Sequence, residues 1–153
     1  MKPHHDKIGF LSSEDSIKLL ANGKYAHLAC QADGELYLVP ITYIFDDNYI
    51  YCHSSPGKKI ELMRKNPNIC IQVEEKKDSL CWESVITWGK FEELKGAEAT
   101  KVAKQLIKKF GETGLRDSDS LESQLSTQLE MAILFRMKID KITGRYEGSN
   151  QLT

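Results

Sequence analysis

Apolar and polar residues alternate along several short stretches of this chain, which is the pattern of β-strands that bury one face. The alternation is clearest at residues 69–74 and 133–140, where every second residue is apolar. The turns at residues 33–34 and 46–48 are too short for crossover helices, so the strands they join are antiparallel. Gly89 is expected to mark a bulge or a close approach of two backbones. The strands expected are residues 25–31, 36–45, 49–54, 69–74, 82–94 and 133–140.

Three other segments carry the signals of short helices. Ser12, followed three residues later by Asp15, is a capping pair that predicts a helix start, and Asn22-Gly23 is a stop signal. A second helix is expected between a Pro-Gly pair at residues 56–57 and an Asn-Pro pair at residues 66–67. Apolar residues in the segment 97–110 recur at the helical spacing, and Gly111 ends this third helix.

About six strands with short helices outside them indicate a mainly β fold, an antiparallel barrel or a tightly curled sheet. Residues 112–130 are polar and weakly patterned, and we expect a loop there with one helical turn. Residues 1–10 are expected to form a mobile tail. The absence of repeats and low-complexity tracts predicts a single domain over residues 1–153.

Composition excludes several classes of function. The chain of 153 residues has a net charge of −1, so it lacks the basic field that holds a nucleic acid or an anionic membrane. No apolar run is long enough for a membrane span, and the first ten residues lack the apolar core of a signal peptide, so we expect a cytoplasmic protein. The cysteines and histidines show no metal-binding spacing, and the cysteines are best explained as buried reduced thiols.

The second predicted helix carries two lysines, Lys58 and Lys59, in its first turn. A cation is unfavourable there because a helix N-terminus has a partial positive charge. His53 and Ser54, at the end of the preceding strand, add hydrogen-bond donors, so this segment offers what a terminal phosphate needs. The residues around the lysines do not match a P-loop. Two solvated lysines on a surface helix explain the segment equally well.

A longer sequence pattern favours the anion site over two solvated lysines. The segment "LVPITYIFDDNYIYCHSSPGKKIELMRKNPNICIQVE" follows "AHLAC" and precedes "WESVITWGKFEEL". Together they resemble the pyridoxamine 5'-phosphate oxidase-like family of FMN-binding split barrels, in particular the branch that includes the nitroimidazole-resistance proteins. The final "IDKITGR" is similar to the ending of that branch, so the resemblance extends from about residue 11 to residue 148. It implies a six-stranded antiparallel split β-barrel with short flanking helices.

The resemblance also implies roles for individual residues. Lys58 and Lys59 match the basic pair that binds the FMN phosphate, with His53 and Ser54 beside them. The strand whose backbone borders the isoalloxazine ring is matched by Val39, Pro40, Ile41 and Thr42. The flavin of this family usually lies at a homodimer interface, and the residues expected to approach the other subunit's cofactor are Trp82 and Ser84. A tryptophan that serves only the core or the interface is an equally good interpretation of Trp82.

The sequence departs from the vitamin B6 oxidases of this family. Those enzymes carry an Arg and a Lys on the strand where this chain has Pro40 and Tyr43, and this chain ends soon after Arg145. We therefore do not expect vitamin B6 synthesis. His27 stands where many relatives have Arg, so it either contacts the phosphate or is a strand histidine with a backbone partner, and the second interpretation is favoured.

Two functions follow from the resemblance. The first is an FMN-dependent oxidoreductase that passes electrons from a reduced donor to a nitro compound, a quinone or dioxygen. The flavin carries out the redox chemistry, so no catalytic residue need be visible in the sequence, and we assign none. The second is a non-catalytic flavin or haem binding or storage protein, for which the candidate axial ligands are His4, His5 and His53. A purely structural domain is the least favoured interpretation.

Overall fold

The structure is a computed structural model that describes residues 8–111 and 129–148. In chain order, the strands in these ranges are β1 (Ile8–Phe10), β2 (Tyr25–Ala32), β3 (Glu35–Asp46), β4 (Tyr49–Ser54), β5 (Asn68–Asp78), β6 (Cys81–Glu93) and β7 (Ile133–Glu147). The helices are α1 (Ser13–Asn22), α2 (Lys58–Lys65) and α3 (Gly96–Gly111). All three predicted helices and all six predicted strands are therefore confirmed. Most of their ends differ from the prediction by a few residues, and β7 extends seven residues beyond it.

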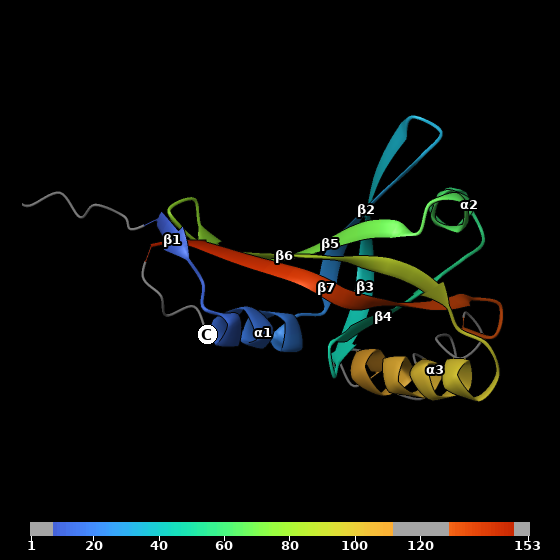
Figure 1. The fold of residues 1–153 in the computed structure, drawn as a ribbon. Coiled ribbons are helices and arrows are strands. Elements are labelled where there is room, and N and C mark those ends of the chain that lie inside the picture. The colour runs from blue at the N-terminus through green and yellow to red at the C-terminus, as the bar shows by residue number, and fades with distance from the viewer. Residues whose placement is uncertain (1–7, 112–128, 149–153) are drawn as a thin grey trace, which may run out of the picture.

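Six of the strands close into a barrel through antiparallel pairs (Figure 1). The sheet has the order β1-β7-β4-β3-β2-β5-β6, and an additional pairing of β7 with β6 completes the ring. The seventh strand, β1, lies outside the ring and pairs only with the end of β7, from Ile8 opposite Glu147 to Phe10 opposite Arg145. The expectation of a mobile tail is therefore wrong for residues 8–10, and residues 1–7 lie outside the described part of the chain.

The closing pair of the barrel contains the bulge expected at Gly89. The register between β6 and β7 shifts between Trp88 and Gly89. A Cβ atom at Gly89 would collide with the backbone carbonyl of Lys138 on the neighbouring strand. Glycine is needed here because the two backbones approach closely.

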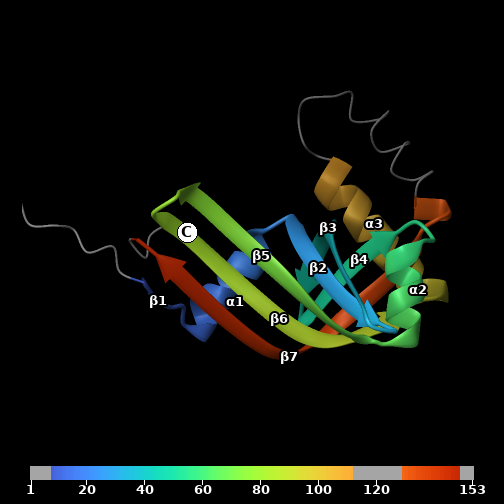
Figure 2. The same ribbon diagram turned by 90° about the horizontal axis from the view of Figure 1, so that it is seen from above.

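The helices begin and end where the sequence predicts. The backbone N–H of Asp15 donates a hydrogen bond of 3.1 Å to the Ser12 hydroxyl at the start of α1. Helix α2 begins after Gly57, and the backbone N–H of Asn66 closes its last turn. Figure 2 shows that β5, β6 and β7 extend past the shorter strands toward β1, and α1 packs under this extension. None of these helices is long and apolar enough to cross a membrane.

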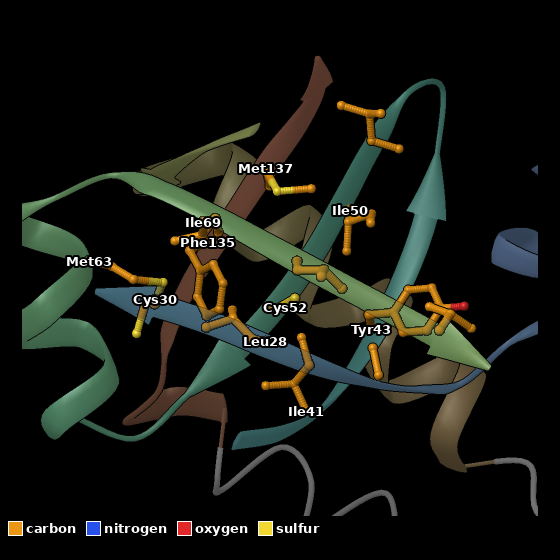
Figure 3. Packing of buried hydrophobic residues seen from close by; sticks show 14 of the residues in the cluster. Leu28, Cys30, Ile41, Tyr43, Ile50, Cys52, Met63, Ile69, Phe135 and Met137 are labelled. Carbon is orange, nitrogen blue, oxygen red and sulfur yellow. The ribbon is translucent and has the colours of Figure 1, made fainter. Parts of the chain in front are cut away.

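The barrel interior is filled by the inward-facing residues of the strands. Leu28, Cys52, Phe135 and Met137 are completely or almost completely buried there (Figure 3). Tyr43 is buried at one end of this cluster, and its hydroxyl donates a hydrogen bond of 2.6 Å to the carbonyl of Leu20 in α1 (Figure 3). A second apolar cluster holds α3 against the outside of the barrel through Ile44, Leu94, Val102, Leu106, Leu129 and Leu134. Most of the predicted loop 112–130 lies outside the described residues.

Candidate functional site

The N-terminus of α2 is open to an anion. The residue at the N-cap position is Gly57, and no side chain caps the first turn of the helix. The backbone N–H groups of that turn therefore carry their partial positive charge without a side-chain acceptor. Helix α2 follows the end of β4 after three residues, so His53 and Ser54 lie close to it in the chain. The first two residues of the helix are Lys58 and Lys59.

Lys59 is the half-buried member of the pair. It forms no hydrogen bond or ion pair with residues 8–111 or 129–148, and its electrostatic neighbours are the thiols of Cys52 and Cys30. Burial lowers the pKa of Lys59, because an ammonium group loses hydration there and no carboxylate compensates. A bound anion would supply the missing charge. Lys59 is therefore the strongest indication of an anion site in the described chain.

Lys58 directly precedes Lys59 in the chain but has a different environment. Its ammonium group forms an ion pair of 2.7 Å with the carboxylate of Glu35, and both side chains are about half exposed, at 45% and 49%. The hydrogen bond to Glu35 raises the pKa of Lys58. The two lysines of the site are therefore not equivalent, because one already has an anionic partner.

His53 connects the lysine pair to the outer face of the barrel. Its Nε2 atom lies 3.2 Å from the hydroxyl oxygen of Thr42 on the neighbouring strand, within hydrogen-bonding distance. Burial, and then the nearby ammonium group of Lys59, lower the pKa of His53 below its usual value. The imidazole ring is therefore mostly neutral at pH 7, and one of its nitrogens donates a hydrogen bond while the other accepts one.

A groove of about 520 Å³ lies on the outer face of β2, β3 and β5. Thr42 is part of its wall, so the groove begins beside His53. The wall is both polar and apolar, as is common in sites for small molecules. The residues that line the groove are Tyr25, Ala26, His27, Pro40, Ile41, Thr42, Gln72 and Glu74.

The sequence places this site in a known family. A sequence model described as pyridoxamine 5'-phosphate oxidase matches residues 12–146, which is most of the chain. The chain belongs to the pyridoxamine 5'-phosphate oxidase family. An uncharacterized protein of Rhizobium meliloti is 33% identical over 150 residues, which cover 93% of this chain and 97% of the relative.

Solved structures of similar proteins agree with this membership. An FAD-binding protein of Mesorhizobium loti is 31% identical and has a TM-score of 0.72, over 93% of this chain and 99% of that one. A candidate 5-nitroimidazole antibiotic resistance protein of Bacteroides thetaiotaomicron has a TM-score of 0.68 over 96% of both chains. At 18% identity, the second similarity concerns the fold alone.

Strand β3, which was predicted to border the isoalloxazine ring of the flavin, has side chains on both of its faces. Val39 and Ile41 face the barrel core, so only their backbone atoms can border a ligand outside. Pro40 and Thr42 face outward and line the groove. The hydroxyl of Ser54 is buried and donates a hydrogen bond of 2.7 Å to the carbonyl of Ser55, so only its lone pairs remain for another partner.

The two residues predicted to act across a dimer lie on β6, and one of them, Ser84, contacts Gln72 of the groove wall. Trp82 and Ser84 are on the outer face of β6, which pairs with β5 and β7 and not with β3 or β4. The indole N–H of Trp82 donates a hydrogen bond of 2.8 Å to Glu147, and the hydroxyl of Ser84 accepts one of 3.0 Å from Gln72. Within one chain, the structure does not bring these two residues to the lysine pair.

Some residues of the site were not predicted from the sequence. Gln72 and Glu74 line the groove and are joined by a hydrogen bond of 3.2 Å, and strand alternation could have placed both on the outer face. Glu35, the partner of Lys58, carried no local signal, because the two residues meet only in the folded chain. His27 lies exposed in the groove, and its side chain has no hydrogen-bond partner within residues 8–111 and 129–148.

Proposed function

We propose that this protein is a flavoprotein that binds FMN and transfers electrons from a reduced donor to a small organic acceptor. The observation that carries the proposal is Lys59, a half-buried ammonium group without an anionic partner among the described residues, at an uncapped helix N-terminus. In a member of the pyridoxamine 5'-phosphate oxidase family, the phosphate of a flavin is the anion expected there. The FAD-binding relative from Mesorhizobium loti supports a flavin.

The charges of the site favour FMN over FAD. A phosphate monoester carries between one and two negative charges at neutral pH, whereas each internal phosphate of FAD carries one. Lys59 and the uncapped N–H groups of α2 offer one full positive charge and part of a second, and Lys58, which is paired with Glu35, adds another cation beside them. This arrangement suits a terminal phosphate, and each charge-assisted hydrogen bond would contribute about 1.5–3 kcal/mol.

The other residues of the site would orient the flavin. Lys59 and Lys58 hold the phosphate, while Pro40 and Thr42 offer an outward-facing surface for the ring. The neutral imidazole of His53 fixes the Thr42 hydroxyl between the phosphate and the ring. When bound, the flavin supplies the hydride and electron transfer, so the protein needs to position and shield it without a catalytic dyad of its own. The acceptors proposed are nitro compounds, quinones and dioxygen.

A homodimer is part of the proposal. Leu36 and Leu38 on the outer face of β3 are 79% and 67% exposed, which is unusual for neighbouring large apolar side chains. A second copy of the chain would cover them and would complete one wall of the flavin site. In that arrangement Trp82 and Ser84, which point outward on β6, approach the flavin of the other protomer.

The first test is the absorption spectrum of the purified protein, with mass spectrometry of any molecule released by heating. We expect two flavin bands and a released mass that matches FMN. A released mass that matches FAD would show that the flavin is FAD. An intense Soret band would show that the cofactor is haem and not a flavin. A colourless protein that also fails to bind added FMN would refute the proposal.

The second test assigns the phosphate to the lysine pair. The variant in which both Lys58 and Lys59 are replaced by Ala should fold and lose most of its FMN, while the matched variant of two exposed α3 lysines, Lys104 and Lys108, should keep it. Equal FMN content in the two variants would show that the lysine pair does not bind the phosphate. Oxidation of a nicotinamide donor in the presence of a nitro compound or a quinone then tests for turnover.

A further inference from the structure

The turn between β2 and β3 is joined to α2 by two ion pairs, one at each end of the helix. Asp33 contacts Lys65 at 2.9 Å, and Glu35 contacts Lys58 at 2.7 Å. A hydrogen bond of 2.8 Å from the Asn66 side chain to the carbonyl of Gln31 adds a third connection. The hairpin of β2 and β3 lies beside α2 in the fold, as Figure 1 shows. The two carboxylates are two residues apart, but they face opposite ends of the helix.

The two ion pairs differ in what the helix dipole does to them. Lys65 lies at the C-terminal end of α2, where a cation is favourable even without Asp33. Lys58 lies at the N-terminal end, where a cation is unfavourable and an anion is favoured. The chain itself provides two carboxylates at this end of the helix: Glu61 in its first turn, and Glu35, which is the one in contact with Lys58.

We propose that Glu35 acts as an internal substitute for the flavin phosphate on Lys58 and lowers the affinity of the site for phosphate-bearing flavins. This inference rests on the proposed function, since it concerns the same phosphate site. An ammonium group has three N–H donors and could contact both anions, but the carboxylate and the phosphate would then repel each other. Glu35 must therefore either leave Lys58 when the phosphate binds or remain and oppose it. Both cases weaken binding of the phosphate, so Glu35 lowers the affinity for FMN and with it the preference of the site for FMN over riboflavin.

The decisive variant is Glu35→Gln, which keeps the shape of the side chain and removes its charge. We expect FMN to bind about twofold to fivefold more tightly to this variant than to the wild type, which is the range expected from the loss of one exposed ion pair. Riboflavin has the same ring without the phosphate, so its dissociation constant should not change. Titrations of the apoprotein, followed by the quenching of flavin fluorescence, measure both constants.

Two controls separate this effect from a general loosening of the turn. The variant Asp33→Asn breaks the ion pair to Lys65 on the same turn and leaves Lys58 untouched, so its FMN affinity should equal that of the wild type. In the background of Lys58→Ala, the substitution Glu35→Gln should have no further effect, because the two residues act through one contact.

The outcomes distinguish this inference from the function on which it rests. If Glu35→Gln binds FMN more tightly and Asp33→Asn does not, the result supports the proposal that Glu35 occupies Lys58 in place of the phosphate. Unchanged or weaker FMN binding overturns it, and weaker binding would mean that Glu35 orients Lys58 for the phosphate. Equal gains for FMN and riboflavin would also overturn it, because the effect would not involve the phosphate. If neither the wild type nor the variant binds FMN, the proposed function falls and this inference falls with it.

Discussion

The ammonium nitrogen of Lys109 in α3 lies 2.7 Å from the carbonyl oxygen of Gly23, the residue that follows α1. The same nitrogen lies 3.2 Å from the carbonyl oxygen of Tyr43 in β3, and 5.1 Å from the centre of its ring. One half-buried lysine therefore joins two helices and a barrel strand. It satisfies a carbonyl at the negative end of the α1 dipole, where a cation is favourable.

Replacement of this lysine should destabilise the fold. The variant Lys109→Met keeps most of the apolar stem and leaves both carbonyls without this donor, so the free energy of unfolding should fall by about 1–2 kcal/mol. Urea denaturation followed by circular dichroism measures the change. The matched variant Lys108→Met alters an exposed neighbour and should change stability by less than about 0.5 kcal/mol. Equal stability of the two variants would show that the contact contributes nothing.

The pKa of His53 should report the charge of Lys59. That ammonium group lowers the pKa of His53 in addition to burial, so the variant Lys59→Met should raise it toward the usual histidine value. It should remain below that value, because burial is the larger cause. Titration of the imidazole carbon-bound protons by NMR measures the shift. Lys58→Met serves as the control, and a shift as large in that variant would contradict the assignment.

A substitution at Gly89 should oppose closure of the barrel. The variant Gly89→Ala places a methyl group against the backbone carbonyl of Lys138, which cannot move without separating β6 from β7. We expect a loss of about 1–3 kcal/mol in the free energy of unfolding. At Gly57, an added Cβ atom has no neighbour within 4 Å, so Gly57→Ala should cost less than about 1 kcal/mol. A Gly89→Ala variant as stable as Gly57→Ala would show that the bulge adapts.

The buried carboxyl of Glu83 should make stability depend on pH. The side chain is 2% exposed, and its Oε2 atom has no hydrogen-bond partner among the described residues. Burial, and then the carboxylates of Glu75 and Asp15, raise the pKa of Glu83. The folded protein therefore binds its proton more tightly than the unfolded chain does, and the free energy of unfolding falls as the pH rises through the raised pKa.

The variant Glu83→Gln should remove this dependence. It should be more stable than the wild type by about 1–3 kcal/mol at pH 8, because it carries no charge to bury, and about equally stable near pH 4. Thermal unfolding across this pH range tests the difference. Glu75→Gln, at an exposed position on β5, should give a smaller gain. A Glu83→Gln variant that is less stable than the wild type at pH 8 would mean that a partner stabilises the charged carboxylate in the folded protein.

The barrel strands could be predicted from the sequence because each of them buries one face. The alternation in residues 69–73 and 133–139 directly reflects this environment. The three residues of β1 have no such pattern, since none of them is fully buried. The strand forms mainly through its backbone pairing with β7, to which Arg145 adds a contact with the ring of Phe10. A strand that is specified by its partner's backbone leaves no signal in its own side chains.

The candidate site also contains some residues that local sequence signals could predict and others that they could not. Lys58, Lys59 and His53 are close in the chain, so a turn and a helix start suggested an anion site, and the resemblance to a flavin-binding family favoured it over two solvated lysines. Glu35 reaches Lys58 through the folding of the β2–β3 hairpin against α2, and no local pattern encodes that contact. The role predicted for Trp82 and Ser84 depends on a second chain, so it remains a prediction.

The pairing of β7 with β1, β4 and β6 has a consequence for synthesis on the ribosome. The other strands of the ring are complete at Glu93, but the barrel cannot close until β7 has emerged. About 50 residues separate these two events, which corresponds to roughly 3–10 s of translation. During that interval one edge of β4 and one edge of β6 have no partner, and exposed edges of this kind invite pairing with other chains. The nascent protein should therefore depend on chaperones most strongly while its last strand is being made.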